Sequence, residues 1–509
     1  MTGAQINPDY AYPRLEALTS WDADWADLAV VVVGLGLTGF SVADTLIELG
    51  ARVVVVDAKD SPEYRAKAQT LTIVGACQVL LGQDAMQTLP QVQGQQPELL
   101  VTSPGIAPEV GILAQARQEK VQIWGDVELA WRLNRRQGRK SPQWLCVTGT
   151  NGKTTTVGML ESILRTAGYK ALAVGNIGTP ILDALRDPVD YDFFAVELSS
   201  FQLHWTRSVS ALAAVVLNLA QDHVDWHQGY SNYLADKARI YQNTQVACIF
   251  NAGQPEIVAM VEEADVQEGC RAVGFWADSP DVSMLGLVED LLVDRAFLDQ
   301  RQTQALELAT VADTAPIPSK HTVENALAAA GLARAAGIEP AAIKAGLQNF
   351  EPGAHRIQAV AHTRGVVWVN DSKATNPHAA SASLAAFSSV IWIAGGLSKG
   401  VDYDQLLAQH AHRLKAVILI GSDSDKLAQA CTRQAPDLKI YRTSDDLADA
   451  GDGAQAMRLA VAQAYELAAS GDTVLLAPAS ASMDQFSSYA DRGNRFIAEV
   501  TALVETLKD

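Results

Sequence analysis

The sequence predicts an α/β protein of three domains, each built around a largely parallel sheet. Short runs of β-branched residues alternate with Ala- and Leu-rich stretches of helical spacing along most of the chain. The alternation restarts twice, after the polar, basic stretch 134–143 and after the turn 351–354. The 509 residues are enough for three or four domains of ordinary size. We therefore expect domains at 1–125, 126–352 and 353–509.

Composition limits the class of function. Lys and Arg total 39 against 58 Asp and Glu, a net charge of −19, which disfavours nucleic acid or an anionic membrane as the main partner. No apolar run reaches the ~18 residues of a membrane span, and the first residues lack the apolar region of a signal peptide. Five scattered cysteines without a C-x-x-C pair are typical of reduced thiols. These features predict a cytoplasmic protein.

The first domain begins with a glycine-rich loop. Runs 28–33, 52–57 and 99–102 are expected to be buried strands, with a helix over 41–50. The first strand leads into Gly34-Leu-Gly-Leu-Thr-Gly39, a G-x-G-x-x-G pattern that can hold a diphosphate at a helix N-terminus, and Asp57 ends the second strand. Taken alone, this pattern also permits an NAD-dependent oxidoreductase, but no hydride-transfer residues accompany it.

The second domain contains a phosphate-binding motif. Strand 144–148 is followed by Gly149-Thr-Asn-Gly-Lys-Thr154 and a helix to about residue 167. Small residues let backbone N–H groups face a polyphosphate, while Lys153 can reach the β- and γ-oxygens and Thr154 can ligate Mg²⁺. The usual pattern has a glycine where this chain has Val147, so the loop is a shorter variant. We interpret it as an ATP site.

Further polar residues follow the next strands of this domain. Strands are expected at 194–197, 213–217 and 247–251, helices at 323–336 and 341–348, and a small antiparallel patch or long loops within 280–318. Glu197 ends the first of these strands, where α/β proteins bind ligands. His223 and His227 are four residues apart, a spacing that on a helix would present both rings to one metal; an ordinary hydrogen-bonded role for either remains open. A Mg²⁺ role is favoured for His223.

The third domain restarts the alternation, with strands expected at 366–371, 390–394, 417–420 and 473–476 and a last helix at 495–507. Gly396-Leu-Ser-Lys-Gly400 fits the G-x-S-x-G pattern of a hydrolase. The later histidines, His410 and His412, lie too close to it to come from a separate loop. We therefore reject the hydrolase interpretation.

Taken together, these motifs resemble the Mur ligases, the ATP-dependent amide ligases of peptidoglycan synthesis. In the second domain the matching segments are 149–154, 174–178, 197–202, 222–223 and 233–237. In the third they are 370–376, 395–400 and 480–486, which resemble the members that add D-glutamate. The resemblance spans essentially the whole chain.

The resemblance implies both a fold and an activity. The fold would be an N-terminal Rossmann-like UDP-binding domain, a central P-loop ATPase-like domain and a C-terminal Rossmann-like domain for the amino acid. The activity would be ADP-forming ligation of D-glutamate to UDP-N-acetylmuramoyl-L-alanine through an acyl phosphate, by a monomer that binds no nucleic acid or membrane. Another Mur-type or a folylpolyglutamate-like ligase stays open as an alternative. A second alternative is a protein that binds nucleotides without catalysis. We disfavour it because such a protein would not need all four of Lys153, Glu197, His223 and Lys237.

The resemblance also implies a set of site residues. ATP and two Mg²⁺ ions are the expected cofactors, with a carbamylated lysine at 237. The implied catalytic residues are Lys153, Glu197, His223 and Lys237, and the implied metal ligands are Thr154, Glu197, His223 and carbamylated Lys237. The implied ATP-binding residues are Gly149, Thr150, Asn151, Gly152, Lys153, Thr154, Thr155, Asn325 and Arg356. The implied UDP-substrate residues are Gly36, Leu37, Thr38, Asp57, Ser103, Gly105 and Asn176. The implied D-glutamate residues are Lys373, Thr375, Lys399, Ser482 and Tyr489.

Overall fold

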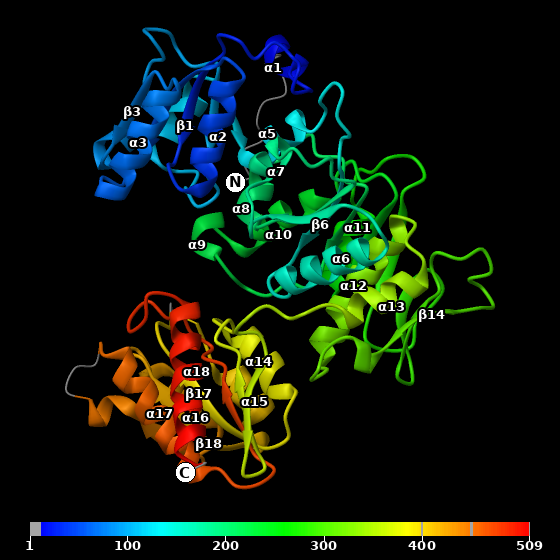
Figure 1. The fold of residues 1–509 in the computed structure, drawn as a ribbon, viewed down its shortest axis with the longest axis vertical. Helices are drawn as coiled ribbons and strands as arrows, with labels where there is room; N and C mark the ends of the chain where they lie inside the picture. Colours follow the sequence, from blue (N-terminus) through cyan, green and yellow to red (C-terminus); the bar gives the residue numbers. More distant parts are fainter. Residues whose placement is uncertain (1–11, 399–400, 448–450, 508–509) are drawn as a thin grey trace. The chain divides into compact units, whose positions relative to one another are not determined.

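The structure is a computed structural model that describes residues 12–398, 401–447 and 451–507. It contains three sheets that follow one another along the chain, with helices between their strands (Figure 1). This confirms the predicted three-domain α/β class. By internal contacts the chain divides into two compact units: residues up to Asp313 with Glu324–Phe350, and Thr314–Val323 with the residues from Glu351 onward. The first two sheets belong to the first unit and the third sheet to the second.

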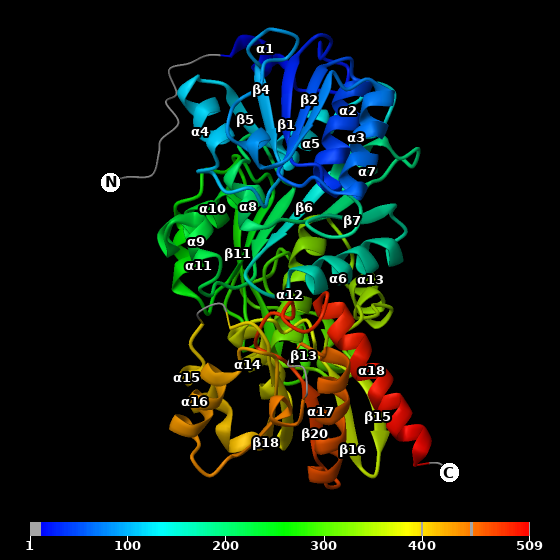
Figure 2. The same ribbon diagram turned by 90° about the vertical axis from the view of Figure 1, so that its left-hand side faces the viewer.

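The first sheet has five parallel strands in the order β3-β2-β1-β4-β5. The strands are β1 (Ala29–Val33), β2 (Arg52–Asp57), β3 (Gln78–Leu81), β4 (Leu99–Thr102) and β5 (Gln122–Gly125). The helices are α1 (Pro13–Ala17), α2 (Leu37–Glu48), α3 (Pro62–Val74), the 3-10 turn η1 (Gln83–Met86), α4 (Gly111–Gln118) and α5 (Asp126–Leu133). Alternate valines of β1 face opposite sides of the sheet, so one set packs with α2, α3 and α5 and the other with α4 (Figure 2).

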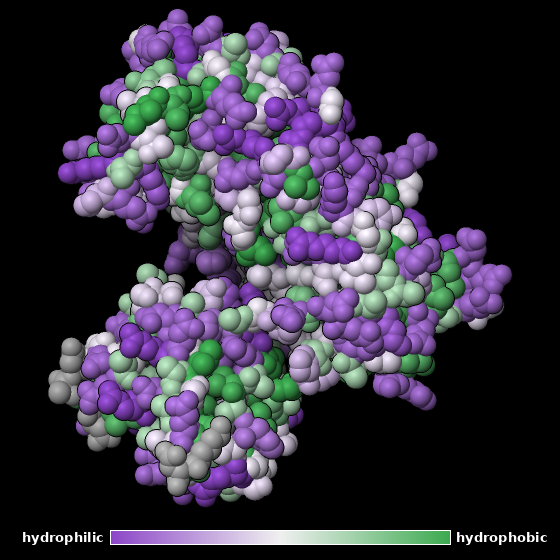
Figure 3. Space-filling view, viewed as in Figure 1, coloured by the Kyte–Doolittle hydropathy of each residue, from purple (hydrophilic) through white to green (hydrophobic). Residues whose placement is uncertain are grey.

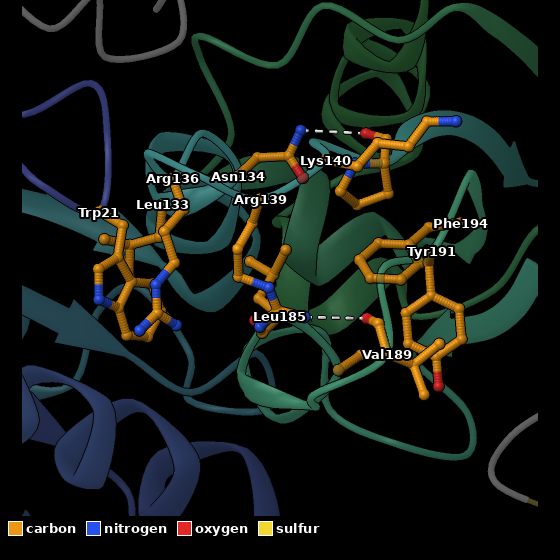
Figure 4. Close-up of a pocket in the computed structure, with 12 residues that line it drawn as sticks. Trp21, Leu133, Asn134, Arg136, Arg139, Lys140, Leu185, Val189, Tyr191 and Phe194 are labelled. Atoms are coloured by element: carbon orange, nitrogen blue, oxygen red, sulfur yellow. Dashed lines mark hydrogen bonds between the residues drawn. The ribbon is translucent and has the colours of Figure 1, made fainter. Parts of the chain in front are cut away.

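The basic stretch 134–143 after α5 forms a connection that lies mostly at the surface. Arg139 donates hydrogen bonds to the carbonyl of Asp187 at 2.6 Å and to the carboxylate of Asp190 at 3.0 Å, and it lines a small pocket (Figure 4). The Arg136 guanidinium lies 4.5 Å from the centroid of the Trp21 ring. These contacts tie the connection to the segment before β8 and to the N-terminal region of the same unit.

The second sheet has nine strands in the order β14-β13-β12-β11-β10-β9-β6-β8-β7. The strands are β6 (Gln143–Thr148), β7 (Ala171–Gly175), β8 (Phe193–Glu197), β9 (Ala213–Val216), β10 (Ala247–Asn251), β11 (Arg271–Phe275), β12 (Met284–Val288), β13 (Leu291–Asp294) and β14 (Leu306–Thr310). The helices and 3-10 turns are α6 (Lys153–Thr166), α7 (Ile181–Arg186), α8 (Ser200–His204), α9 (Val224–His227), α10 (Tyr230–Ala238), η2 (Arg239–Tyr241), α11 (Pro255–Glu262), η3 (Val311–Asp313), α12 (Lys320–Ala335) and α13 (Pro340–Gln348). Pairing is parallel up to β12 and antiparallel from β12 to β14, which confirms the small antiparallel patch expected within 280–318.

The strand order of this sheet places the phosphate loop at a point where successive connections run to opposite sides of β6. β6 lies between β8 and β9. The connection through α6 leads to β7 on one side of β6, whereas the connection through α8 leads to β9 on the other side. The ends of β6, β8 and β9 therefore open on a crevice of the kind in which parallel α/β sheets bind ligands.

The third sheet has six strands in the order β15-β16-β20-β17-β18-β19, with antiparallel pairing only at β15. The strands are β15 (Gln358–Thr363), β16 (Val366–Asn370), β17 (Val390–Gly395), β18 (Leu414–Ile420), β19 (Lys439–Arg442) and β20 (Thr473–Leu476). The helices and 3-10 turns are α14 (Pro377–Ala385), α15 (Asp404–His410), η4 (Ala411–Arg413), α16 (Asp425–Gln434), η5 (Thr443–Asp446), α17 (Gly453–Leu467) and α18 (Tyr489–Thr506). α14, α15 and α16 pack on one face and α17 and α18 on the other (Figure 2).

The last helix is longer than expected. It begins at Tyr489 and not at residue 495, because the Ser488 hydroxyl caps it by accepting a hydrogen bond from the Asp491 N–H at 3.1 Å. Among the described residues, no helix combines the length and the apolar character that crossing a bilayer requires. Hydrophilic side chains predominate on the face shown in Figure 3.

Candidate active site

The phosphate loop has the expected strand, loop and helix around it. β6 ends at Thr148, and Gly152 caps α6 in the left-handed conformation, with φ of 84°. A Cβ atom at Gly152 would lie 2.3 Å from Oδ1 of Asn325, so the loop needs a residue without a side chain here. Asn325, one of the residues expected at the nucleotide, is thus beside the loop.

Residues that sequence reasoning did not single out hold this loop. The Asn151 N–H donates to Oδ1 of Asn218 at 2.9 Å, and Nδ2 of Asn218 donates to the Asn151 carbonyl at 3.0 Å. The Thr150 hydroxyl lies 2.7 Å from the Tyr233 hydroxyl. The signal that could have found Asn218 is its position two residues beyond the end of β9, the strand that pairs with β6.

Two lysines meet at one carbonyl of the loop. Nζ of Lys153 donates to the carbonyls of Gly149 and Thr150 at 2.9 and 3.0 Å. Nζ of Lys237, on α10, donates to the same Gly149 carbonyl at 3.0 Å and to the Thr148 hydroxyl at 3.2 Å. The fold thus brings together two of the four expected catalytic residues, which are 84 positions apart by their numbers.

Burial gives Lys237 unusual electrostatics. Its side chain is almost fully buried. Burial, and then the neighbouring charge of Lys153, lower the pKa of Lys237 well below its usual value, although Asp222 and Glu197 act in the opposite direction. A neutral amine has two N–H donors, which match the two acceptors at Lys237, and its lone pair is left for reaction.

Glu197 ends β8 with one carboxylate oxygen occupied. Oε1 accepts a hydrogen bond from Nδ2 of Asn176 at 3.0 Å, and the Glu197 carbonyl accepts one from the Asn176 N–H at 2.9 Å. Oε2 is buried and has no hydrogen-bond partner. A buried carboxylate oxygen without a partner is unfavourable unless a cation or donor meets it, so this atom fits a Mg²⁺ ligand.

The two histidines have different environments. His223 precedes α9 in the left-handed conformation and lies 3.5 Å from the carboxylate of Asp222, with about half of its side chain exposed. Partial burial lowers the pKa of His223, and Lys153 and Lys237 add to this while Asp222 opposes it. His227 is buried, and both of its ring nitrogens are 2.9 Å from hydrogen-bond partners. His223 and His227 therefore do not present their rings to one metal.

No group of three or more His, Cys, Asp or Glu side chains in the described part of the chain could hold a metal. Cations at this site would take their ligands from Glu197, His223, the Thr154 hydroxyl, a modified Lys237 and substrate oxygens. Such a mixed set is usual for Mg²⁺, which binds through few carboxylates together with phosphates.

The glycine-rich loop of the first sheet leads into α2, which begins at Leu37 and not at residue 41 as expected. Both carboxylate oxygens of Asp57 accept main-chain hydrogen bonds, from the Leu35 N–H at 2.6 Å and from the Lys59 N–H at 2.7 Å. Asp57 therefore shapes the loop, and its oxygens are engaged where a dehydrogenase would need them for a ribose. Leu37 is two-thirds exposed at the tip. The Ser103 hydroxyl is buried against the loop without a partner.

The described residues that were expected to bind D-glutamate all lie in the second compact unit. Nζ of Lys373 lies 3.8 Å from the ring centroid of Tyr489, and the Thr375 N–H donates to the Lys373 carbonyl at 2.8 Å. Ser482 is buried. Arg356 is half-buried in this same unit. Lys399 lies outside the described residues.

A buried arginine that sequence reasoning missed connects two loops of the second compact unit, the one that contains Ser372 and the one that contains Ser480. Arg492 donates from Nε to the Ser372 hydroxyl at 3.0 Å and from Nη1 to the Ser480 carbonyl at 3.2 Å. Burial lowers the pKa of Arg492 to about 9. Nothing in the sequence distinguishes this arginine from others on a helix.

Comparison with known proteins identifies the class. Three family models match the chain: the Mur ligase MurD-like N-terminal domain over residues 28–125, the Mur ligase middle domain over 147–333, and the Mur ligase glutamate ligase domain over 355–480. The chain belongs to the Mur ligase family. The domain bounds 1–125, 126–352 and 353–509 stay a prediction.

Individual proteins with similar sequences or folds show which members of the family this chain resembles. The chain is 49% identical over 499 residues to the UDP-N-acetylmuramoylalanine--D-glutamate ligase of Leifsonia xyli, covering 96% of this chain and 95% of that protein. It is 51% identical over 474 residues to the enzyme of the same name from Streptomyces coelicolor, covering 93% and 98%. A solved structure of a pseudomurein peptide ligase type C from Methanothermus fervidus, 17% identical, has the same fold with a TM-score of 0.54, covering 93% of this chain and all of that one.

Proposed function

We propose that this protein is an ATP-dependent, ADP-forming ligase that joins D-glutamate to the L-alanyl carboxylate of UDP-N-acetylmuramoyl-L-alanine. One observation carries the proposal: Lys153 and Lys237 donate to one carbonyl of the phosphate loop, and Glu197 and His223 lie near enough to Lys237 to interact with its charge. Relatives of about half identity over nearly the whole chain are named for this reaction. The chemistry belongs to peptidoglycan synthesis and so to cell-wall growth and division.

The reaction requires one anion to attack another. The substrate carboxylate attacks the γ-phosphate of ATP, ADP leaves, and the acyl phosphate then reacts with the amino group of D-glutamate to release phosphate. Neutralising the γ-phosphate is the main task of the site. The N–H groups at the start of α6 would face the phosphates, because those of Thr150 and Asn151 already donate to Asn218. Nζ of Lys153 would exchange its loop carbonyls for the β- and γ-oxygens.

Two Mg²⁺ ions fit the remaining residues. Thr154 and the unpartnered Oε2 of Glu197 would hold one ion, and His223 with a modified Lys237 would hold the other. The ions supply positive charge where phosphate and carboxylate meet. Asn176 orients Glu197 and leaves the free oxygen directed away from its own amide.

We propose that Lys237 carries an N-carbamate. Its lowered pKa favours the neutral amine, whose lone pair attacks CO₂ to form a C–N bond with loss of one proton. The product is an anion, and it turns the buried amine into an oxygen ligand for a cation.

The other expected residues divide among UDP-N-acetylmuramoyl-L-alanine, D-glutamate and ATP. Gly36, Leu37 and Thr38 at the start of α2 would contact the diphosphate of the UDP moiety, with Asp57, Ser103 and Gly105 around it. Lys373, Thr375 and Ser482 supply a cation and hydroxyls suited to a dicarboxylate, with Tyr489 beside them and Lys399 expected to join. Arg356 would contact a nucleotide phosphate and Asn325 the ribose. We propose that the protein acts in the cytoplasm, in keeping with its free cysteines, and as a monomer.

The test is phosphate release from ATP with UDP-N-acetylmuramoyl-L-alanine and a panel of amino acids. Turnover with D-glutamate alone is expected, and Lys153→Ala should lower the rate at least a hundredfold while Lys170→Ala, at an exposed lysine of the same unit, leaves it unchanged. Turnover with another acid or amino acid would indicate another Mur-type or folylpolyglutamate-like ligase. Hydride transfer to NAD would overturn the proposal.

A further inference from the structure

A chain of buried hydrogen bonds lies behind the phosphate loop. Nδ1 of His204 and Nδ1 of His227 both lie 2.9 Å from the same oxygen, Oδ2 of Asp236. Nε2 of His227 lies 2.9 Å from the Ser200 hydroxyl. Asp236, His227 and Ser200 are each at most 5% exposed. We call Ser200, His204, His227 and Asp236 the α8–α10 network.

The chemistry of these groups sets the direction of the hydrogen bonds. Oδ2 of Asp236 is the acceptor that the two imidazoles share, with a ring nitrogen of each histidine at 2.9 Å. An ionised carboxylate only accepts, so both imidazoles donate their Nδ1–H to it. With its Nδ1–H directed at Asp236, the His227 ring meets the Ser200 hydroxyl at Nε2, so every polar atom of the ring is engaged.

The network joins the segments next to three of the four candidate metal ligands. Ser200 opens α8, three residues after Glu197. His227 ends α9, and His223 immediately precedes that helix. Asp236 is the neighbour of Lys237 on α10. Consequently one set of hydrogen bonds connects the backbone next to Glu197, His223 and Lys237.

α9 depends on such an anchor. It has four residues, and the residues on both sides of it, His223 and Gln228, have left-handed backbones with φ of 51° and 57°. Left-handed backbone is unfavourable for residues other than glycine and persists only where surrounding contacts enforce it. The Phe201 ring of α8 packs against His223 and His227, at 4.8 and 5.6 Å between ring centroids, and the hydrogen bonds of His227 fix the other end of the helix.

We propose that Ser200, His227 and Asp236 are positioning residues that hold His223 and Lys237 in the geometry in which they bind a divalent cation at the phosphate loop. The inference rests on the proposed function for the role of that cation. Pinning Asp236 fixes the rotation of α10 about its axis, and Lys237, one residue further, then points at Gly149. None of the three contacts the loop itself, so their effect is exerted through His223 and Lys237.

The same three residue types, in the order Ser–His–Asp, form the nucleophilic relay of many hydrolases. Here the Ser200 side chain is buried at the start of α8, where no substrate reaches it. The burial of Ser200 therefore supports a positioning role and not a nucleophilic one.

The experiment measures cation binding directly and compares two buried carboxylates. Asp236→Asn removes the charge that holds both histidines. Asp294→Asn is the matched control, because Asp294 is also buried and accepts hydrogen bonds from the Ala296 N–H and from Arg334, away from the phosphate loop. Electron paramagnetic resonance would follow Mn²⁺ binding to the full-length protein with a non-hydrolysable ATP analogue. Nuclear magnetic resonance with ¹³C-bicarbonate would follow the carbamate signal.

Asp236→Asn should weaken Mn²⁺ binding at least fivefold and reduce the carbamate signal, whereas Asp294→Asn should lower the melting temperature without changing either. Ser200→Ala, which removes only one hydroxyl, should weaken Mn²⁺ binding about threefold and serves if Asp236→Asn does not fold. Unchanged Mn²⁺ binding in a folded network variant, or an equal loss in Asp294→Asn, would overturn the inference. Wild-type protein that binds Mn²⁺ and the analogue but makes no ADP with D-glutamate would instead refute the proposed function.

Discussion

Asn218 and Asn151 hold each other through a reciprocal pair of hydrogen bonds across the phosphate loop. The amide oxygen of Asn218 accepts from the Asn151 N–H at 2.9 Å, and its amide nitrogen donates to the Asn151 carbonyl at 3.0 Å. One side chain from the end of β9 thus satisfies both main-chain groups of the loop's third residue. A loop fixed in this way is prepared for phosphate before ATP arrives.

Asn218→Ala should raise the KM for ATP about tenfold with a smaller change in kcat. The substitution removes two hydrogen bonds that are worth about 1 kcal/mol each, so the loop must be ordered by the nucleotide itself. Asn349→Ala is the control, since the only described hydrogen bond of the Asn349 side chain is a long one to the Thr166 hydroxyl at 3.4 Å. Steady-state kinetics with varied ATP checks this. Equal KM values in the two variants would contradict it.

Two glycines of the first loop should respond differently to alanine. A Cβ atom at Gly39 would lie 1.9 Å from the Gly34 carbonyl oxygen, whereas a Cβ atom at Gly36 would meet nothing within 4 Å. Gly39→Ala should therefore lower the free energy of unfolding by about 2 kcal/mol or more. Gly36→Ala should leave the free energy of unfolding nearly unchanged, so any loss of activity in this variant would reflect substrate binding. Urea unfolding of both variants is the measurement, and similar stabilities would refute this reading of the loop.

The ring of Tyr489, and not its hydroxyl, faces Lys373. Tyr489→Phe should therefore leave the KM for D-glutamate within about twofold. Tyr489→Leu should raise it about fivefold, because a cation over an aromatic ring is worth about 1 kcal/mol and the lysine would lose its fixed position. Amino-acid titrations at saturating ATP distinguish the two variants. A large effect of the phenylalanine would mean that the hydroxyl contacts the substrate.

Asp126 should make the stability of the protein depend on pH. Burial raises its pKa to about 6, despite a hydrogen bond from Gln202, and its Oδ1 has no partner. The folded state thus binds this proton more tightly than the unfolded chain, so the free energy of unfolding falls as pH rises from about 4 to about 6 and stays lower above that. The side chain of the Asp126→Asn variant cannot ionise, so its free energy of unfolding does not fall for this reason as pH rises.

Relative to wild type, Asp126→Asn should therefore gain about 1 kcal/mol of stability between pH 5 and pH 8. Urea unfolding at both pH values gives the difference, in which other titrating groups cancel. Asp60→Asn is the comparison, because Asp60 is exposed and its pKa is lowered by a hydrogen bond from Arg65. A gain that does not change with pH would contradict the assignment.

Strongly patterned elements were predictable to the residue. The bounds of β2, β4, β10 and β20 match the expected strands, because each is a run of mostly apolar residues ended by turn residues. Edge strands such as β3 and β19 were missed, since they are half exposed and carry no strong alternation. The start of α18 was missed although its cap, Ser488, is visible in the sequence.

For the candidate site, the sequence alone determined what is contiguous: a loop of small residues with Lys153 after a strand, and Glu197 at the end of another. The tertiary structure decided what lies beside them. Asn218 reaches Asn151 and Lys237 reaches Gly149 because β6 is placed between β8 and β9, and residue periodicity does not encode strand order. Burial of Lys237 and the sharing of Asp236 by two histidines are likewise consequences of packing between helices, where the low dielectric acts on groups far apart in the chain.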